Sequence, residues 1–150
     1  MKRSLFACLL GLFFFTLTKA QAPNPINWTA TYKSISATEG EIIITGTLEK
    51  GWHTYSQRPT DAGPIPTSFT FTPSKFYKPE GKTTESNAHE EFVKAFDAKI
   101  FVFNEKAEFR QKIKLTGKGG FTVAVKVDYM CCNDMMCLPP KTVELQVKVQ

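Results

Sequence analysis

The fold is decided by the segment FTVAVKVDYMCCNDMMCLPPKTVELQVKV (residues 121–149), in which two alternating runs flank three cysteines. Every second residue from Phe121 to Tyr129 is large and apolar, and the same holds from Val143 to Val149. Because successive side chains of a β-strand point to opposite faces, each run would bury one face and expose the other. Such alternation is typical of antiparallel sheets, whereas strands of parallel sheets tend to be apolar on both faces.

The same pattern recurs along most of the chain, at residues 26–32, 42–48, 69–71, 101–103 and 109–115. About eight closely spaced strands with Gly and Pro turns predict an all-β fold, an immunoglobulin-like antiparallel β-sandwich. A small barrel is the alternative. The weakly patterned stretch from Pro73 to Ala98 predicts a long loop, which is usually functional or mobile. A short helical turn over residues 88–96 is compatible with it.

The N-terminus has the pattern of a secretory signal peptide. Lys2 and Arg3 precede an apolar run from Leu5 to Leu17, and the small residues Ala20 and Ala22 mark a cleavage site. An apolar run of about thirteen residues is shorter than the roughly 20 that span a bilayer. We therefore predict a cleaved signal peptide over residues 1–22 and one domain over residues 23–150.

Composition and charge exclude several classes of protein. The chain is 42% hydrophobic and 22% charged, which is not the composition of a disordered protein. Three of its 19 basic residues and none of its 14 acidic residues lie in the signal peptide, so the net charge falls from +5 to +2. So small a charge argues against a nucleic-acid partner. The motifs of serine hydrolases, zinc proteases and phosphate-binding loops are absent from the sequence.

Three cysteines lie within seven residues in the predicted domain, and their positions suggest how they pair. If the strand through Tyr129 runs on, Cys131 continues its inward face and Cys132 points outward or begins a turn. Cys132 and Cys137 flank a four-residue loop, 133–136, so their Cα atoms can come within the ~4.4–6.8 Å that a disulfide requires. A Cys131–Cys137 bridge is possible if the strand ends early. We predict the Cys132–Cys137 bridge, with Cys131 as a buried free thiol.

The residues around the cysteines allow three hypotheses. A bridge that closes so short a loop removes little entropy from the unfolded chain, and exposed bridges tend to be easily reduced, which favours a redox role. An immunoglobulin-like interaction domain with a structural disulfide is the second hypothesis. The third is a Cu(I)-binding module, because thiolate and thioether ligands suit Cu(I). Its ligands would be Cys131, Cys132, Cys137 and Met135.

The motif CNDMMCLPP (residues 132–140), following a strand that ends at Tyr129, resembles the redox motif of one known family. This family is the N-terminal periplasmic domain of the thiol:disulfide interchange protein DsbD. The stretch GWHTYS (residues 51–56) resembles the aromatic segment that packs beside the disulfide in the family. The resemblance covers the chain from about Trp28 to Val149 and implies an immunoglobulin-like sandwich with an exposed redox disulfide.

The resemblance also implies an activity, a location and partners. It implies a periplasmic thiol-disulfide oxidoreductase, or protein-disulfide reductase, that relays reducing equivalents to oxidised partner proteins without a cofactor. Thioredoxin-like proteins would be both electron donor and electron acceptor. Because the family's membrane segment has no counterpart in these 150 residues, a separate membrane electron transporter is a further expected partner.

The family's site residues carry over only in part. Cys137 matches the cysteine that forms mixed disulfides with partners, and Cys132 matches the cysteine that resolves them. His53 and Tyr55 occupy the places of two site tyrosines, so His53 is a departure from the family. Strand alternation places His53 and Tyr55 on one face, with Trp52 on the other.

A cap and an acidic pair complete the family's site. Phe96 is the best match for the aromatic cap that shields the disulfide, and Phe92 is the second. The acidic pair beside the cap has no clean counterpart, because Glu90 and Glu91 lie nearby but are offset.

Overall fold

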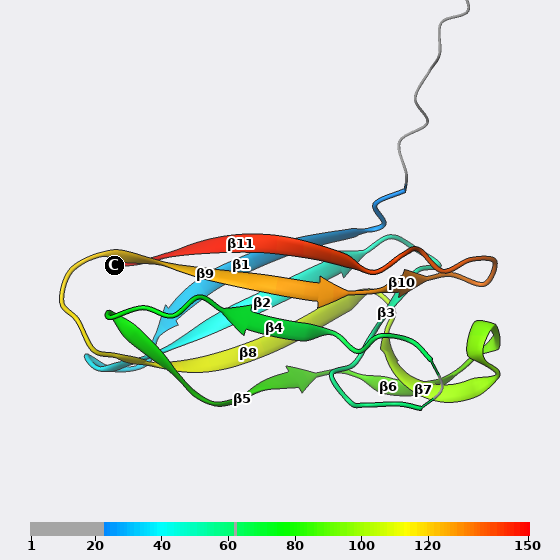
Figure 1. The fold of residues 1–150 in the computed structure, drawn as a ribbon, viewed down its shortest axis with the longest axis horizontal. Helices are drawn as coiled ribbons and strands as arrows, with labels where there is room; N and C mark the ends of the chain where they lie inside the picture. The colour runs from blue at the N-terminus through cyan, green and yellow to red at the C-terminus, as the bar shows by residue number, and fades with distance from the viewer. Residues whose placement is uncertain (1–22, 62) are drawn as a thin grey trace, which may run out of the picture.

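The computed structural model describes residues 23–61 and 63–150, which fold almost entirely into antiparallel β-strands (Figure 1). The predicted signal peptide lies outside the described residues. No helix in the described part of the chain has the length and apolar character needed to cross a membrane. The elements in chain order are β1 (Ile26–Ser34), β2 (Glu39–Leu48), β3 (His53–Tyr55), β4 (Ser68–Phe71), β5 (Tyr77–Ser86), β6 (His89–Val93), the 3₁₀ turn η1 (Lys94–Phe96), β7 (Ala98–Phe103), β8 (Lys106–Leu115), β9 (Phe121–Tyr129), β10 (Cys131–Cys132) and β11 (Lys141–Val149).

Two sheets form the sandwich, one in the order β1-β2-β8-β5 and the other in the order β11-β9-β4. Their inner faces meet in one apolar core, to which β9 contributes alternate residues, as its sequence predicts. Aromatic pairs cross between the sheets. Phe69 of β4 lies 4.8 Å from Phe109 of β8, and Tyr129 of β9 lies 5.4 Å from Trp28 of β1, between ring centroids. The all-β sandwich predicted from the alternation is therefore confirmed.

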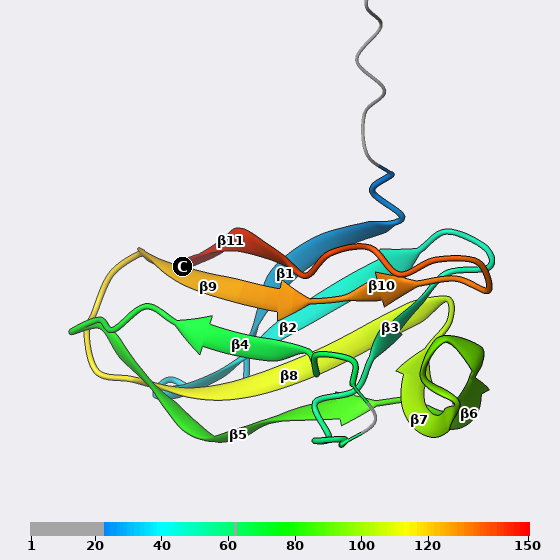
Figure 2. The same cartoon turned by 45° about the vertical axis from the view of Figure 1, so that its right-hand side comes forward.

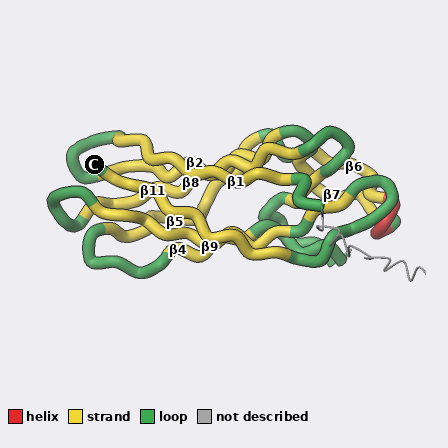
Figure 3. Tube along the Cα trace, turned by 90° about the horizontal axis from the view of Figure 1, so that it is seen from above, coloured by secondary structure: helices red, strands yellow, loops and turns green. Residues whose placement is uncertain are grey.

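A third, smaller sheet in the order β10-β3-β7-β6 occupies one end of the molecule. Figures 1 and 2 place it at the end opposite the C-terminus, and Figure 3 shows β6, β7 and the 3₁₀ turn at that end. It has its own apolar cluster, built on the buried side chains of Tyr55, Val93, Ile100, Val102 and Cys132. The cysteine segment thus joins the main sandwich to this end sheet.

The expectation of a long loop over residues 73–98 is wrong, because this stretch contains the strands β5 and β6. β5 is an edge strand whose side chains, apart from Tyr77, are partly or fully exposed, so it lacks an apolar face. Its pairing with β8 also shifts register between Glu80 and Thr84, around Gly81, whose φ of +68° favours glycine. The helical turn expected over residues 88–96 is confined to Lys94–Phe96, and the strand β6 precedes it.

Candidate redox site

The cysteine segment forms a short hairpin that begins in β10. Cys132 and Cys137 are joined by a disulfide with a Cα–Cα distance of 4.0 Å, which is the predicted pair. The loop between them is held by its own hydrogen bonds. The side-chain oxygen of Asn133 accepts from the backbone N–H groups of Met135 and Met136, at 2.9 and 2.8 Å, and the Asn133 N–H donates to the Met136 carbonyl. The loop is therefore a defined turn that fixes the position of Cys137.

The three cysteines face different surroundings. Cys131 is a buried free thiol in the main core, as predicted from the parity of β9. Burial raises the pKa of the Cys131 thiol to about 11, so it stays protonated at neutral pH. Cys132 is fully buried, whereas Cys137 is partly exposed.

The expectation that Cys132 points outward, in an exposed disulfide, is therefore wrong in part. Cys132 does leave the main core, but its face is covered by the second cluster of β3, β6 and β7. Solvent reaches the bridge from the Cys137 side, because only this cysteine of the pair is partly exposed. The pair is thus asymmetric, with one fully buried and one partly exposed cysteine.

Strand β3 places His53 and Tyr55 beside the disulfide. His53 pairs with Cys132 and Thr54 with Cys131 in the register of β3 and β10. The His53 Nε2 atom is hydrogen-bonded to the Tyr55 hydroxyl at 3.1 Å, which confirms that the two side chains share a face. Both side chains are buried, His53 with 8% of its surface exposed.

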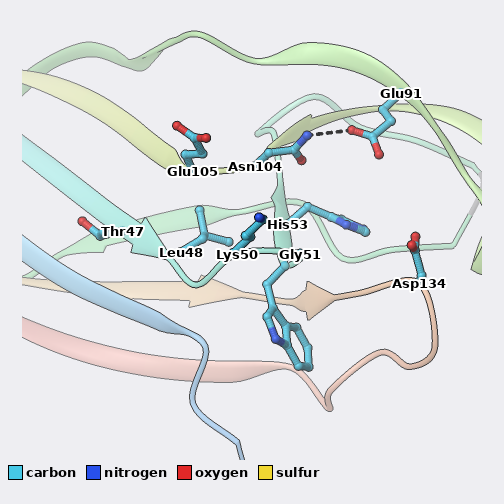
Figure 4. Close-up of a pocket in the computed structure, with 10 residues that line it drawn as sticks. Thr47, Leu48, Lys50, Gly51, His53, Glu91, Asn104, Glu105 and Asp134 are labelled. Atoms are coloured by element: carbon cyan, nitrogen blue, oxygen red, sulfur yellow. Dashed lines mark hydrogen bonds between the residues drawn. The ribbon is translucent and has the colours of Figure 1, made fainter.

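A cleft of about 710 Å³ opens next to His53, and three acidic residues line it, none of which sequence reasoning assigned to the site. One is Glu105, and the other two act on the charge of His53. They are Glu91 of β6 and Asp134 of the cysteine loop, and Figure 4 shows the imidazole of His53 extending toward the side of the cleft where they lie. The Glu91 carboxylate accepts a hydrogen bond of 2.9 Å from Asn104, which lowers the pKa of Glu91. Asp134 could have been suspected from its place between the cysteines. No sequence pattern indicated Asn104.

Opposing effects set the charge of His53. Burial lowers the pKa of His53 below 6.5, and the negative charges of Glu91 and Asp134 act in the opposite direction to a smaller extent. The desolvation effect is larger, so His53 is neutral at pH 7. Burial also raises the pKa of Tyr55 far above its usual range, so its hydroxyl stays protonated.

The two candidate cap residues differ in position. The Phe96 ring lies edge-on to Tyr55 with 6.1 Å between centroids, and it packs against the second cluster together with Cys137. Phe92, on β6, has 52% of its surface exposed. Gly63 also lies close to Phe96, because a Cβ at this glycine would come within 3.0 Å of the ring. Phe96 therefore packs against the cluster that contains Cys132, whereas Phe92 is exposed.

The loop that carries Gly63 is tied to the sandwich at its base. The Glu85 carboxylate accepts hydrogen bonds from the Ser56 hydroxyl at 2.5 Å and from the Gln57 N–H at 2.8 Å. The Arg58 guanidinium lies 3.5 Å from the same carboxylate and stacks 3.8 Å above the Phe101 ring. These contacts tie the start of the loop to β5 and β7.

The four residues proposed as Cu(I) ligands do not converge in this oxidised form. Cys132 and Cys137 are bonded to each other, and Cys131 lies in the core. Met135 projects into solvent with 90% of its surface exposed. Within residues 23–61 and 63–150, no group of three or more His, Cys, Asp or Glu side chains is arranged to hold a metal ion.

The fold and the site define a class of protein: an immunoglobulin-like β-sandwich that carries a disulfide in a short loop, with one cysteine buried and one partly exposed. The family model of the N-terminal domain of the thiol:disulfide interchange protein DsbD matches residues 20–148, and the chain belongs to this family. Family membership supports thiol–disulfide exchange as its general activity. No curated protein sequence matches the chain.

Solved structures show the same fold. The reduced DsbD N-terminal domain of Neisseria meningitidis matches with a TM-score of 0.54 and 13% identity, over 83% of this chain and 85% of that chain. The N-terminal periplasmic domain of ScsB from Proteus mirabilis matches with a TM-score of 0.56 and 15% identity, over 81% of this chain and 44% of that chain. Because the sequence identities are this low, the two structures show a similarity of fold alone.

Proposed function

We propose that the chain relays reducing equivalents to oxidised partner proteins through the Cys132–Cys137 pair. The observation that carries the proposal is the asymmetry of the bridge, since Cys137 is partly exposed and Cys132 is fully buried. A thiol exchange protein needs one sulfur that a partner can reach and a second that resolves the mixed disulfide from within. Cys137 and Cys132 fit these two roles.

The exchange proceeds in two substitutions at sulfur. The Cys137 thiolate attacks a partner disulfide, so that one partner sulfur forms a mixed disulfide with Cys137 and the other leaves as a thiolate that takes up a proton. The Cys132 thiolate then attacks the Cys137 sulfur and releases the partner's second thiolate. Two electrons have moved to the partner, which becomes a dithiol, and the Cys132–Cys137 disulfide has formed. An upstream dithiol reverses these steps to reset the protein.

His53, Tyr55 and Phe96 serve this reaction as site-lining groups in the proposal. Phe96 packs edge-on against Tyr55 and lies, like Cys137, against the cluster that covers Cys132, where it would limit the approach of small thiols. A protein partner would displace Phe96 on docking. The hydrogen bond between the Tyr55 hydroxyl and His53 would fix the position of the Tyr55 ring, on which Phe96 packs.

Thioredoxin-like proteins are the proposed electron donor and acceptor, with a separate membrane electron transporter as the proposed source of electrons. The proposed location is the periplasm. Two observations support this location: the signal-peptide pattern of residues 1–22, and the similarity of the chain to the N-terminal periplasmic domain of ScsB from P. mirabilis. No cofactor enters the proposed reaction, because both steps need only sulfur nucleophiles.

The reduction potential of the Cys132–Cys137 couple tests the proposal. We expect a value between about −180 and −270 mV, the range of exchange proteins, from equilibration in glutathione buffers with mass spectrometry to locate the bridge. A potential below about −300 mV would show a structural disulfide and overturn the proposal. Metal retained by the reduced protein but not by a Cys132→Ser variant would favour the Cu(I) alternative instead.

The roles of the two cysteines are tested by trapping. A Cys132→Ser variant should accumulate a mixed disulfide through Cys137 when mixed with an oxidised thioredoxin-like protein, because the resolving thiol is gone. A Cys137→Ser variant should accumulate none. Trapping through Cys132 would contradict the assignment.

A further inference from the structure

Two methionine side chains stand in solvent between the redox cysteines. Met135 has 90% of its surface exposed and Met136 has 52%. The turn is held by hydrogen bonds of the Asn133 side chain and of the backbone, and neither thioether takes part in them. Exposed apolar side chains of this size lose hydrophobic stabilisation, and methionine is common at surfaces that bind several partners. Their position therefore calls for an explanation outside the stability of the fold.

Any protein that reacts at Cys137 must cover these methionines. Consecutive Cα atoms are about 3.8 Å apart, so Met136 adjoins Cys137 and Met135 lies one residue further along the same turn. A protein interface of ordinary size buries roughly 800 Å² on each partner, which is far more than the surface of one sulfur. The two thioethers thus lie inside the footprint of a partner that docks on Cys137.

The same side chains are the sulfur groups most open to an oxidant in the disulfide form. Cys132 and Cys137 are protected by their bond, and Cys131 is buried with 2% of its surface exposed. Among the described residues the remaining sulfur is that of Met130, which is partly buried against the second cluster. Thioether oxidation needs direct access of the oxidant to sulfur.

We propose that Met135 and Met136 form a modification site for oxidants of the peroxide class, and that their oxidation slows exchange with thioredoxin-like partners. In the reaction the thioether sulfur attacks one peroxide oxygen and the O–O bond breaks. The products are a sulfoxide and, from hydrogen peroxide, water. Sulfur loses two electrons and the peroxide gains them. The sulfoxide replaces an apolar contact by a polar, chiral group, which weakens docking without changing the disulfide. The effect on exchange rests on the proposed function, whereas the oxidation itself does not.

The test compares each protein with its own untreated sample. The protein in its disulfide form is treated with hydrogen peroxide. Peptide mass mapping then follows the gain of one oxygen at Met130, Met135 and Met136. The rate of reduction of the Cys132–Cys137 disulfide is then measured with a reduced thioredoxin and with dithiothreitol. The variants are the Met135→Leu, Met136→Leu double variant and the Met130→Leu control, because leucine has similar volume and no sulfur.

We expect Met135 and Met136 to gain oxygen before Met130. Peroxide should lower the rate with thioredoxin about fivefold, equivalent to ~1 kcal/mol, and the rate with dithiothreitol less than about twofold. The double variant should lose this sensitivity, and the Met130→Leu control should keep it.

Three results would overturn the inference: earlier oxidation of Met130, an equal loss of rate with both reductants, or a double variant as sensitive as the wild type. Failure of the proposed function has a different signature. In that case untreated protein would be reduced by thioredoxin no faster than by dithiothreitol at equal thiol concentration. The docking half of the inference would then fall, and the mass map would still decide the oxidation half.

Discussion

At the residue scale, His53 is the site-lining residue whose burial has the clearest physical consequence. Its ring is hydrogen-bonded to Tyr55 and faces Glu91 and Asp134, yet burial keeps it neutral. A neutral imidazole in the folded state and a titrating one in the unfolded state make stability depend on pH.

The predicted pH dependence follows from the lowered pKa of His53. As the pH falls below 6.5, His53 is protonated in the unfolded chain while it is still neutral in the folded protein. The free energy of unfolding therefore decreases. Each unit by which the folded pKa is lowered contributes up to about 1.4 kcal/mol. Urea unfolding between about pH 7.5 and pH 5.5, above the range of the acidic groups, should show the decrease in the wild type. A His53→Gln variant should lack it, and the exposed-histidine control His89→Gln should retain it.

Cys131 gives a second prediction at this scale. The thiol is buried and burial raises its pKa to about 11, so little thiolate forms and little of it is reachable. Iodoacetamide at about pH 8 should leave Cys131 unmodified in the folded, oxidised protein and modify it rapidly in urea. Mass spectrometry of the alkylated peptide measures both rates. Rapid modification of the folded protein would show that the segment opens, which would revive Cys131 as a redox partner.

At the scale of elements, the structure gives the two candidate cap residues clearly different surroundings. Phe96 ends the 3₁₀ turn η1 and packs on Tyr55, whereas Phe92 is exposed on β6. Both were candidates because the sequence does not show which strands pair in this region, and therefore not which aromatic side chain faces the disulfide.

Replacing the cap should expose the bridge to small thiols. Phe96→Ala removes a ring that packs on Tyr55 and against the cluster that covers Cys132. The rate of disulfide reduction by dithiothreitol should then rise about fivefold, because access limits exchange. The same variant loses an aromatic contact worth about 0.5–1.5 kcal/mol of stability. Phe92→Ala is the matched control and should change neither quantity. Equal rates for the wild type and Phe96→Ala would remove Phe96 from the cap role.

The strands themselves show what sequence can and cannot give. Strands β9 and β11 were predictable, since one face of each packs on the core and the other meets water. β5 was not, because it is an edge strand with a bulge and buries mainly Tyr77. The sheltering of Cys132 was missed for the same reason, since the polar strand β6 and the turn that cover it carry no alternating pattern.

At the scale of the whole molecule, the disulfide lies outside the packing that holds the sandwich together. The main core is built from the two larger sheets, and Cys132 belongs to the smaller cluster at the end. In the proposed function the protein cycles between oxidised and reduced forms and must stay folded in both. The sandwich would then have to be stable without the bridge.

Removal of the bridge should therefore cost little stability. The cysteines are five residues apart in sequence, and closing so short a loop stabilises the folded state by about 2 kcal/mol through the entropy of the unfolded chain. The Cys132→Ala, Cys137→Ala double variant should unfold in urea as one cooperative transition, with a free energy of unfolding lower by about that amount and an unchanged slope. Circular dichroism should show the same β-structure before unfolding.

A loss of about 4 kcal/mol or more, or a variant that does not fold, would mean that the bridge is a structural disulfide. A bridge stabilises the protein by more than the entropy of its own short loop only if it holds packed structure in place. The wild type reduced with dithiothreitol should match the double variant, which separates the loss of the bond from the loss of the two side chains.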